Sequence, residues 1–151
     1  MRVGKIAAPA LALLLMSGCG GGAPAEDDRP PMGQPVVVEG GEYRELIVPE
    51  LQVMLQDKDF PLINVHIPFA GDLPGTDDSI PFNEIANHLD RLPEDRDATI
   101  VLYCRTGPMS SQAVEVLVGL GYTDVYHLDG GFNAWAEWGL PVEGSPATAN
   151  P

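Results

Sequence analysis

The chain has 151 residues and a formal net charge of −14 at pH 7. This length corresponds to one ordinary domain, which can bury enough surface to fold without disulfides or metal ions. Its acidity argues against nucleic-acid binding, because affinity for phosphate backbones comes mainly from lysine and arginine side chains.

The first eighteen residues have the organisation of an export signal. Arg2 and Lys5 precede an apolar run at 6–16, and two small residues follow it. This run is shorter than the roughly 20 residues that a membrane-spanning helix needs, so a retained transmembrane anchor is not expected. We therefore predict a cleaved signal peptide over residues 1–18.

The signal ends on a cysteine. Residues 15–19, Leu-Met-Ser-Gly-Cys, resemble the lipobox of bacterial lipoproteins, with Met16 where leucine is usual. The resemblance implies that Cys19 is acylated and becomes the N-terminus, anchoring the protein to a membrane outside the cytoplasm, on the periplasmic side or the cell surface. The alternative is an ordinary signal peptide with Cys19 as an incidental thiol.

Two further segments have the composition of flexible chain. Residues 19–35 are rich in Gly, Pro and Ala, which predicts a tether, and residues 145–151 predict a disordered tail. Residues 36–144 are left as a single folded domain.

Within residues 36–144, short apolar runs alternate with stretches of helical period. This pattern predicts an α/β domain with a central parallel sheet flanked by helices on both faces. We expect strands at 43–47, 62–65, 80, 99–103 and 124–128. We expect helices at 49–56, 82–92, 110–120 and 132–138, with Gly121 as a C-cap. The irregular segment 66–79 is expected at the strand ends, where parallel sheets bind ligands.

A cysteine joins the strongest predicted strand to a helix. Cys104 directly follows the strand at 99–103, and the next helix is expected to begin at Ser110. The unpaired N–H groups and the dipole of a helix N-terminus favour thiolates and anions. Arg105 adds a positive charge, and Gly107 permits the backbone geometry of an anion cradle. From this pattern alone, Cys104 is either a nucleophile or a buried packing residue.

Four motifs in the correct order resemble the rhodanese-like domain family. The cysteine loop matches the family pattern Cys-Arg-x-Gly-x-Arg-Ser at Cys104, Arg105, Gly107 and Ser110. The others are Leu-Ile-Asn-Val-His at 62–66, Gly-Asp-Leu-Pro-Gly-Thr at 71–76 followed by Ile-Pro at 80–81, and Leu-Asp-Gly-Gly-Phe-Asn-Ala-Trp at 128–135. The resemblance covers roughly residues 43–143.

This resemblance implies a sulfurtransferase or persulfide carrier. Cys104 would accept sulfane sulfur from a small donor and pass it to a thiol acceptor. The loop would bind the donor and the transferred sulfur through Arg105, Thr106, Gly107, Pro108, Met109 and Ser110. No cofactor and no metal is expected. The alternative is a non-catalytic module whose loop binds a small anion or senses redox state.

Three histidines and a glycine pair need their own interpretations. His66, His88 and His127 lack the spacing of metal ligands, which favours surface or packing roles. Of these, His66 lies beside the expected loop and is the candidate proton carrier. The sequence Asp-Gly-Gly at 129–131 is typical of a turn.

The loop departs from the family pattern at two positions. Met109 stands where the second loop arginine is usual, and Pro108 removes one N–H group. Both changes weaken anion binding, so we expect poor efficiency with thiosulfate and a preference for less charged donors. Asn64 and His66 replace an Asp and an Arg that often form ion pairs in the family. Phosphatase or arsenate chemistry would require arginine six residues after the cysteine, where Ser110 stands.

Overall fold

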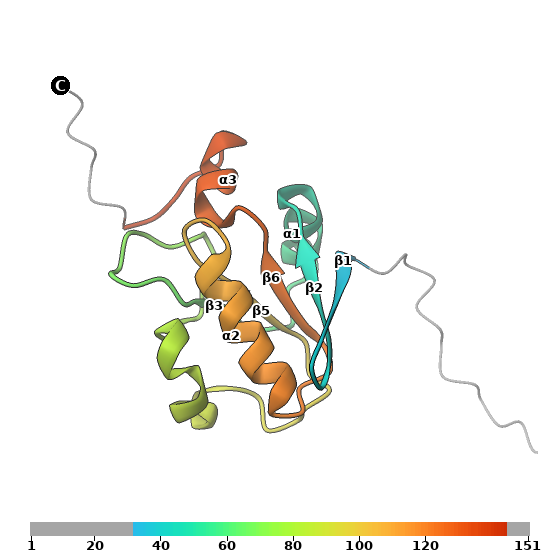
Figure 1. Cartoon of the computed structure of the whole chain (residues 1–151). Helices are drawn as coiled ribbons and strands as arrows, with labels where there is room; N and C mark the ends of the chain where they lie inside the picture. The colour runs from blue at the N-terminus through green and yellow to red at the C-terminus, as the bar shows by residue number, and fades with distance from the viewer. Residues whose placement is uncertain (1–31, 145–151) are drawn as a thin grey trace, which may run out of the picture. The chain divides into compact units, whose positions relative to one another are not determined.

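A six-stranded sheet forms the centre of the part of the chain that the structure describes, residues 32–144 of a computed structural model (Figure 1). Its order is β1-β2-β6-β5-β3-β4. The strands are β1 (Gln34–Val38), β2 (Gly41–Leu46), β3 (Leu62–Asn64), β4 (Asp78–Ser79), β5 (Ile100–Tyr103) and β6 (Val125–Leu128). The sheet is parallel except for the antiparallel pair β1 and β2, so the predicted parallel core is confirmed. The expected signal peptide, Cys19, most of the expected tether and the expected tail at 145–151 lie outside the described residues.

Strand β1 is missing from the elements predicted by sequence. It begins at Gln34, inside the segment expected to be a tether and two residues ahead of the expected domain boundary at 36. Pro35 lacks a backbone N–H, and β1 accepts it because the strand lies at the edge of the sheet. Gly40, with φ of +95°, lies in the turn that returns the chain into β2. The sheet therefore includes residues whose composition resembled a linker.

The helices agree with the predicted order and differ in type and start. They are α1 (Val48–Met54), the 3₁₀ turns η1 (Leu55–Asp57), η2 (Phe82–Asn87) and η3 (Leu89–Arg91), then α2 (Pro108–Gly119) and α3 (Gly131–Glu137). The single helix expected over 82–92 is thus wrong, because two 3₁₀ turns occupy it. Phe82 and Ile85 are three residues apart, which is the repeat of a 3₁₀ turn. Gly121 follows α2 with φ of +93°, as expected for a C-cap.

Both faces of the sheet are covered, as predicted. Strand β5 is buried along its whole length and alternates between two apolar clusters. Ile100 and Leu102 pack with α2 and η2, whereas Val101 and Tyr103 pack with α1 and α3. Within residues 32–144, no helix is long and apolar enough to cross a membrane. The central strand β5 therefore leads directly from the core to Cys104.

Candidate active site

Cys104 follows the last residue of β5 and is the first residue of the connection to α2. It is a free thiol and is 1% exposed. The Gly107 N–H donates a hydrogen bond to Sγ at 3.0 Å, and the Ser110 hydroxyl lies 3.6 Å from the same sulfur. The sulfur is therefore held by a backbone amide and a hydroxyl at the start of a helix, the type of environment that stabilises a thiolate.

Helix α2 begins two residues earlier than predicted, at Pro108 instead of Ser110. Gly107 precedes it with φ of +111°, a conformation that favours glycine. Proline is common at the first helical position because its missing N–H has no intrahelical partner there. The earlier start places Ser110 in the first turn, where its side chain is fully buried beneath the loop.

Two backbone N–H groups in the first turn of α3 donate hydrogen bonds to the cysteine loop. The Phe132 N–H donates to the Cys104 carbonyl at 3.0 Å, and the Asn133 N–H donates to the Arg105 carbonyl at 3.1 Å. Gly131, with φ of +56°, approaches so closely that a Cβ there would lie 2.2 Å from the Cys104 oxygen. The glycine motif at 129–131 thus does more than form a turn, because Gly131 lets the backbone of α3 contact the cysteine loop directly.

The predicted loop residues are brought together in one turn, with different exposures. Arg105, Thr106 and Pro108 are exposed, whereas Gly107 is buried. Met109 is half-buried and packs against the cluster that contains Ala113 and Leu117 of α2. Met109 therefore contributes apolar contacts from the first turn of α2.

His66 lies near the loop, as predicted. Its ring meets that of Phe132 edge to face with centroids 5.8 Å apart. Burial and the positive charge of Arg105 lower the pKa of His66 below its ordinary value. Its Nδ1 is buried and has no hydrogen-bond partner among the described residues. The role of His66 as a proton carrier stays a prediction.

His127 of β6 contacts Ser110, which in turn lies against Cys104 Sγ, whereas the sequence favoured a surface or packing role for this histidine. Its ring is 2% exposed, and Nδ1 lies 3.2 Å from Ser110 Oγ. On the other side, Nε2 lies 3.4 Å from Oε1 of Glu45 in β2. Ser110 and His127 are 17 residues apart and meet because α2, which follows β5, packs against the neighbouring strand β6. No sequence spacing could have indicated this contact.

A hydrogen-bonded network centred on Asn64 lies at the end of β3. Its Nδ2 donates to the Gly71 carbonyl at 2.9 Å and to Asp72 Oδ1 at 2.8 Å, and its Oδ1 accepts the His66 N–H at 2.9 Å. The Tyr103 hydroxyl donates to the same Asp72 oxygen at 3.1 Å. The amide of Asn64 thus donates to two acceptors and accepts one backbone N–H within this network.

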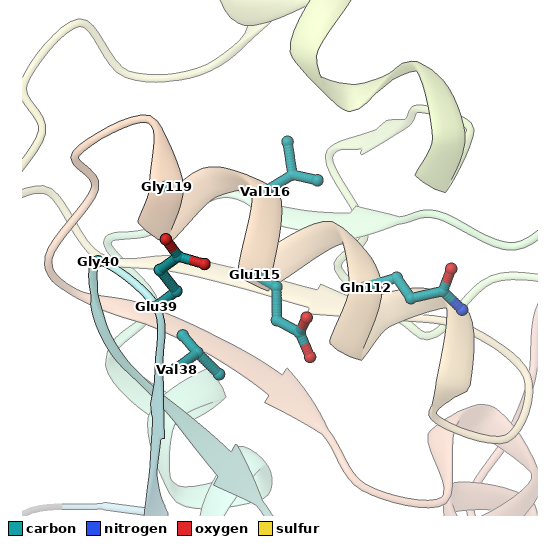
Figure 2. A pocket seen from close by; sticks show the side chains of 7 residues that line it. All are labelled: Val38, Glu39, Gly40, Gln112, Glu115, Val116 and Gly119. Atoms are coloured by element: carbon teal, nitrogen blue, oxygen red, sulfur yellow. The ribbon is translucent and has the colours of Figure 1, made fainter.

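A groove of about 670 Å³ lies elsewhere on the molecule, between α2 and the β1–β2 turn (Figure 2). Two carboxylates, Glu39 and Glu115, line it together with Val38, Val116 and Gln112. None of the loop residues 104–110 contributes to it. Within residues 32–144, no group of three or more His, Cys, Asp or Glu side chains could hold a metal ion.

The cysteine loop and the fold define a class of protein. The sequence profile of the rhodanese-like domain matches residues 53–137, and the chain belongs to this family. A sulfurtransferase from Allochromatium vinosum is 43% identical over 63 residues, which is 42% of this chain and 57% of that protein. Thiosulfate sulfurtransferase GlpE from Pseudomonas syringae is 36% identical over 92 residues, covering 59% of this chain and 84% of that protein.

Solved structures show the same architecture. A rhodanese-related protein from Thermoplasma volcanium aligns with a TM-score of 0.56 at 28% identity, over 66% of this chain and 97% of its own. The rhodanese-like domain of an Anabaena sp. protein gives a TM-score of 0.59 at 23% identity, over 71% of this chain and 83% of its own. At that identity the Anabaena likeness concerns the fold alone. Together these comparisons confirm the predicted family and fold class.

Proposed function

We propose that the protein is a sulfurtransferase or persulfide carrier whose reacting atom is Cys104 Sγ. The observation that carries this proposal is the Gly107 N–H, 3.0 Å from a sulfur placed at the start of α2. The sulfurtransferases among its relatives support the same chemistry. A backbone amide aimed at sulfur stabilises the negative charge that the thiolate and the persulfide both carry.

The reaction divides into two displacements at sulfur. The Cys104 thiolate attacks the outer sulfur of the donor, the donor's sulfur–sulfur bond breaks, and the remainder of the donor leaves as an anion. An acceptor thiolate then attacks the outer sulfur of the Cys104 persulfide, which restores the Cys104 thiolate and leaves the sulfur on the acceptor. We infer that Arg105, Thr106 and the loop backbone bind the anionic part of the donor.

Intact-mass analysis of the full-length protein tests this proposal. The chain carries Cys19→Ser in every sample so that Cys104 is its one thiol. Incubation with thiosulfate, glutathione persulfide or a polysulfide should add the mass of one sulfur atom. A Cys104→Ser control should gain nothing, and later addition of a thiol should remove the adduct from the parent protein.

A second function is a module that binds a small anion or senses redox state. Two observations favour it: Cys104 is 1% exposed, and Met109 packs into the core where the family has arginine. In that case no donor would add sulfur to Cys104. Mild peroxide would instead modify Cys104 stoichiometrically, and a reductant would reverse the modification.

We further propose that Cys19 is acylated and holds the domain at a membrane outside the cytoplasm. The lipobox-like segment at 15–19 supports this location. Labelling of a bacterial host with an alkyne fatty acid should tag the full-length protein and leave Cys19→Ala untagged. Equal labelling of both proteins, or of neither, would contradict the anchor.

A further inference from the structure

A continuous line of polar groups leads from the reacting sulfur to the protein surface. Cys104 Sγ lies 3.6 Å from Ser110 Oγ, which lies 3.2 Å from His127 Nδ1, and His127 Nε2 lies 3.4 Å from Glu45 Oε1. Ser110 and His127 are 0% and 2% exposed, whereas the Glu45 side chain is 40% exposed. The line therefore connects a buried thiol with a carboxylate in contact with solvent.

Ser110 has one hydroxyl proton and several partners that could receive it. Its oxygen lies 2.8 Å from the Gly107 carbonyl, in addition to Cys104 Sγ and His127 Nδ1. When His127 is neutral and its Nε2–H faces Glu45, Nδ1 accepts the hydroxyl proton of Ser110. When His127 is protonated, Nδ1–H donates to Ser110, and the hydroxyl can then donate to sulfur. The protonation state of His127 thus sets the direction of the Ser110 hydroxyl.

A proton can move along this line without any other reactant. The S–H proton of Cys104 passes to Ser110 Oγ as the Ser110 hydroxyl proton passes to His127 Nδ1. The products are a thiolate at Cys104 and an imidazolium at His127, and Nε2–H keeps its bond to Glu45. The number of protons in the group is unchanged.

The surroundings of His127 act on its charge in opposite directions. Burial lowers the pKa of His127, whereas the carboxylates of Glu45 and Asp129 oppose this effect. Among the described residues Tyr43 also faces His127, and the two rings meet edge to face with centroids 5.4 Å apart. While Cys104 keeps its proton, the His127 ring is therefore neutral at neutral pH, and its Nδ1 can accept a proton. Ionisation of Cys104 adds the negative charge that favours the imidazolium.

We propose that Ser110, His127 and Glu45 form a positioning relay in which His127 holds the proton released by the Cys104 thiol. The inference rests on the proposed role of Cys104 as the sulfur acceptor. None of the three residues needs to touch the donor. They act on the population of the attacking thiolate.

The test is a pH titration of the thiolate by its ultraviolet absorbance, since this readout needs no access to the buried sulfur. The full-length chain carries Cys19→Ser, and the signal of a matched Cys104→Ser protein is subtracted. His127→Gln can keep hydrogen bonds to both neighbours but cannot hold the proton as a cation. We expect its ratio of thiolate to thiol at neutral pH to fall roughly tenfold, the effect of losing one nearby opposite charge.

His88→Gln is the control, because His88 pairs with Glu84 on η2 and not with the loop. Its titration should coincide with that of the parent protein. Coincident curves for His127→Gln and the parent protein would overturn the relay.

A second measurement leaves His127 in place. It tests the relay even if His127→Gln does not fold. The imidazole signals of His127 are titrated by NMR in the parent protein and in Cys104→Ser. Because coupling between two sites is reciprocal, His127 should lose its proton at lower pH when the thiolate is removed. An unchanged His127 titration would also overturn the relay. Both readouts are independent of sulfur transfer, so failure of the proposed function is recognised separately by the absence of a sulfur adduct.

Discussion

Gly131 and Cys104 approach each other so closely that no side chain fits between them. A Cβ on Gly131 would lie 2.2 Å from the Cys104 carbonyl oxygen and 2.6 Å from the Arg105 carbonyl carbon. The backbone of α3 is therefore pressed directly against the cysteine loop, and two α3 amides donate to loop carbonyls.

Gly131→Ala should consequently displace the loop and destabilise the fold. We expect the free energy of unfolding to fall by more than the roughly 1–3 kcal/mol that a left-handed backbone costs a non-glycine residue. Gly139→Ala is the matched control, because Gly139 has φ of +75° and open space around its Cβ position. Chemical denaturation of both variants measures the difference, and equal losses would contradict the steric role of Gly131.

Met109→Arg should improve the use of thiosulfate. The substitution places a cation beside the loop, and the arginine stem can retain part of the apolar contact that Met109 makes. We expect kcat/KM for thiosulfate to rise about tenfold, with a smaller change for an uncharged sulfur donor. Val116→Arg adds the same charge at an exposed position further along α2 and should leave the ratio between donors unchanged. An unchanged kcat/KM for thiosulfate in Met109→Arg would show that the missing arginine does not limit activity with this donor.

Asn64→Asp should destabilise the domain although the family often has aspartate at this position. The new carboxylate would face the Gly71 carbonyl and the Asp72 carboxylate in a fully buried site. We expect a loss of roughly 3 kcal/mol in the free energy of unfolding at neutral pH. Adding Asp72→Asn should recover much of it, since an amide can then donate to the carboxylate. A double-mutant cycle by urea denaturation measures this coupling, and purely additive losses would contradict it.

His66 should make the fold less stable in acid. Burial and Arg105 lower its folded pKa below the ordinary value of 6.5. The unfolded chain therefore binds more protons as pH falls, so this contribution is present above about 6.5 and is lost as pH falls towards the folded pKa. His66→Gln should show a shallower loss of stability over that window than the parent protein. In Arg105→Met, NMR should show the pKa of His66 moving back towards 6.5.

The sheet core and the cysteine loop could be predicted because each is encoded in a short, continuous stretch of sequence. Strand β5 is an uninterrupted apolar run, and Cys104 and Gly107 follow it within one turn of chain. Edge strand β1 was not predictable in the same way, since its burial is partial and its sequence begins Gln34-Pro35. The start of α2 at Pro108 was missed because Pro108 was assigned to the cysteine loop, whereas it occupies the first helical position.

The remaining parts of the site depend on contacts between distant segments. His127 reaches Ser110 because α2 packs against β6, and it reaches Glu45 because β2 lies beside β6 in the sheet. Gly131 resembles an ordinary turn glycine until α3 is placed against the Cys104 carbonyl. These relationships require the strand order, which local periodicity does not contain.

The support that α3 gives to the loop has a consequence for the order in which the domain is built. During synthesis the N-terminal part of the chain emerges first, and Cys104 precedes the two α3 amides that hold its loop by nearly thirty residues. All six strands can therefore be present before the loop acquires its final shape. The surroundings of the Cys104 thiol are therefore completed only when α3 is in place.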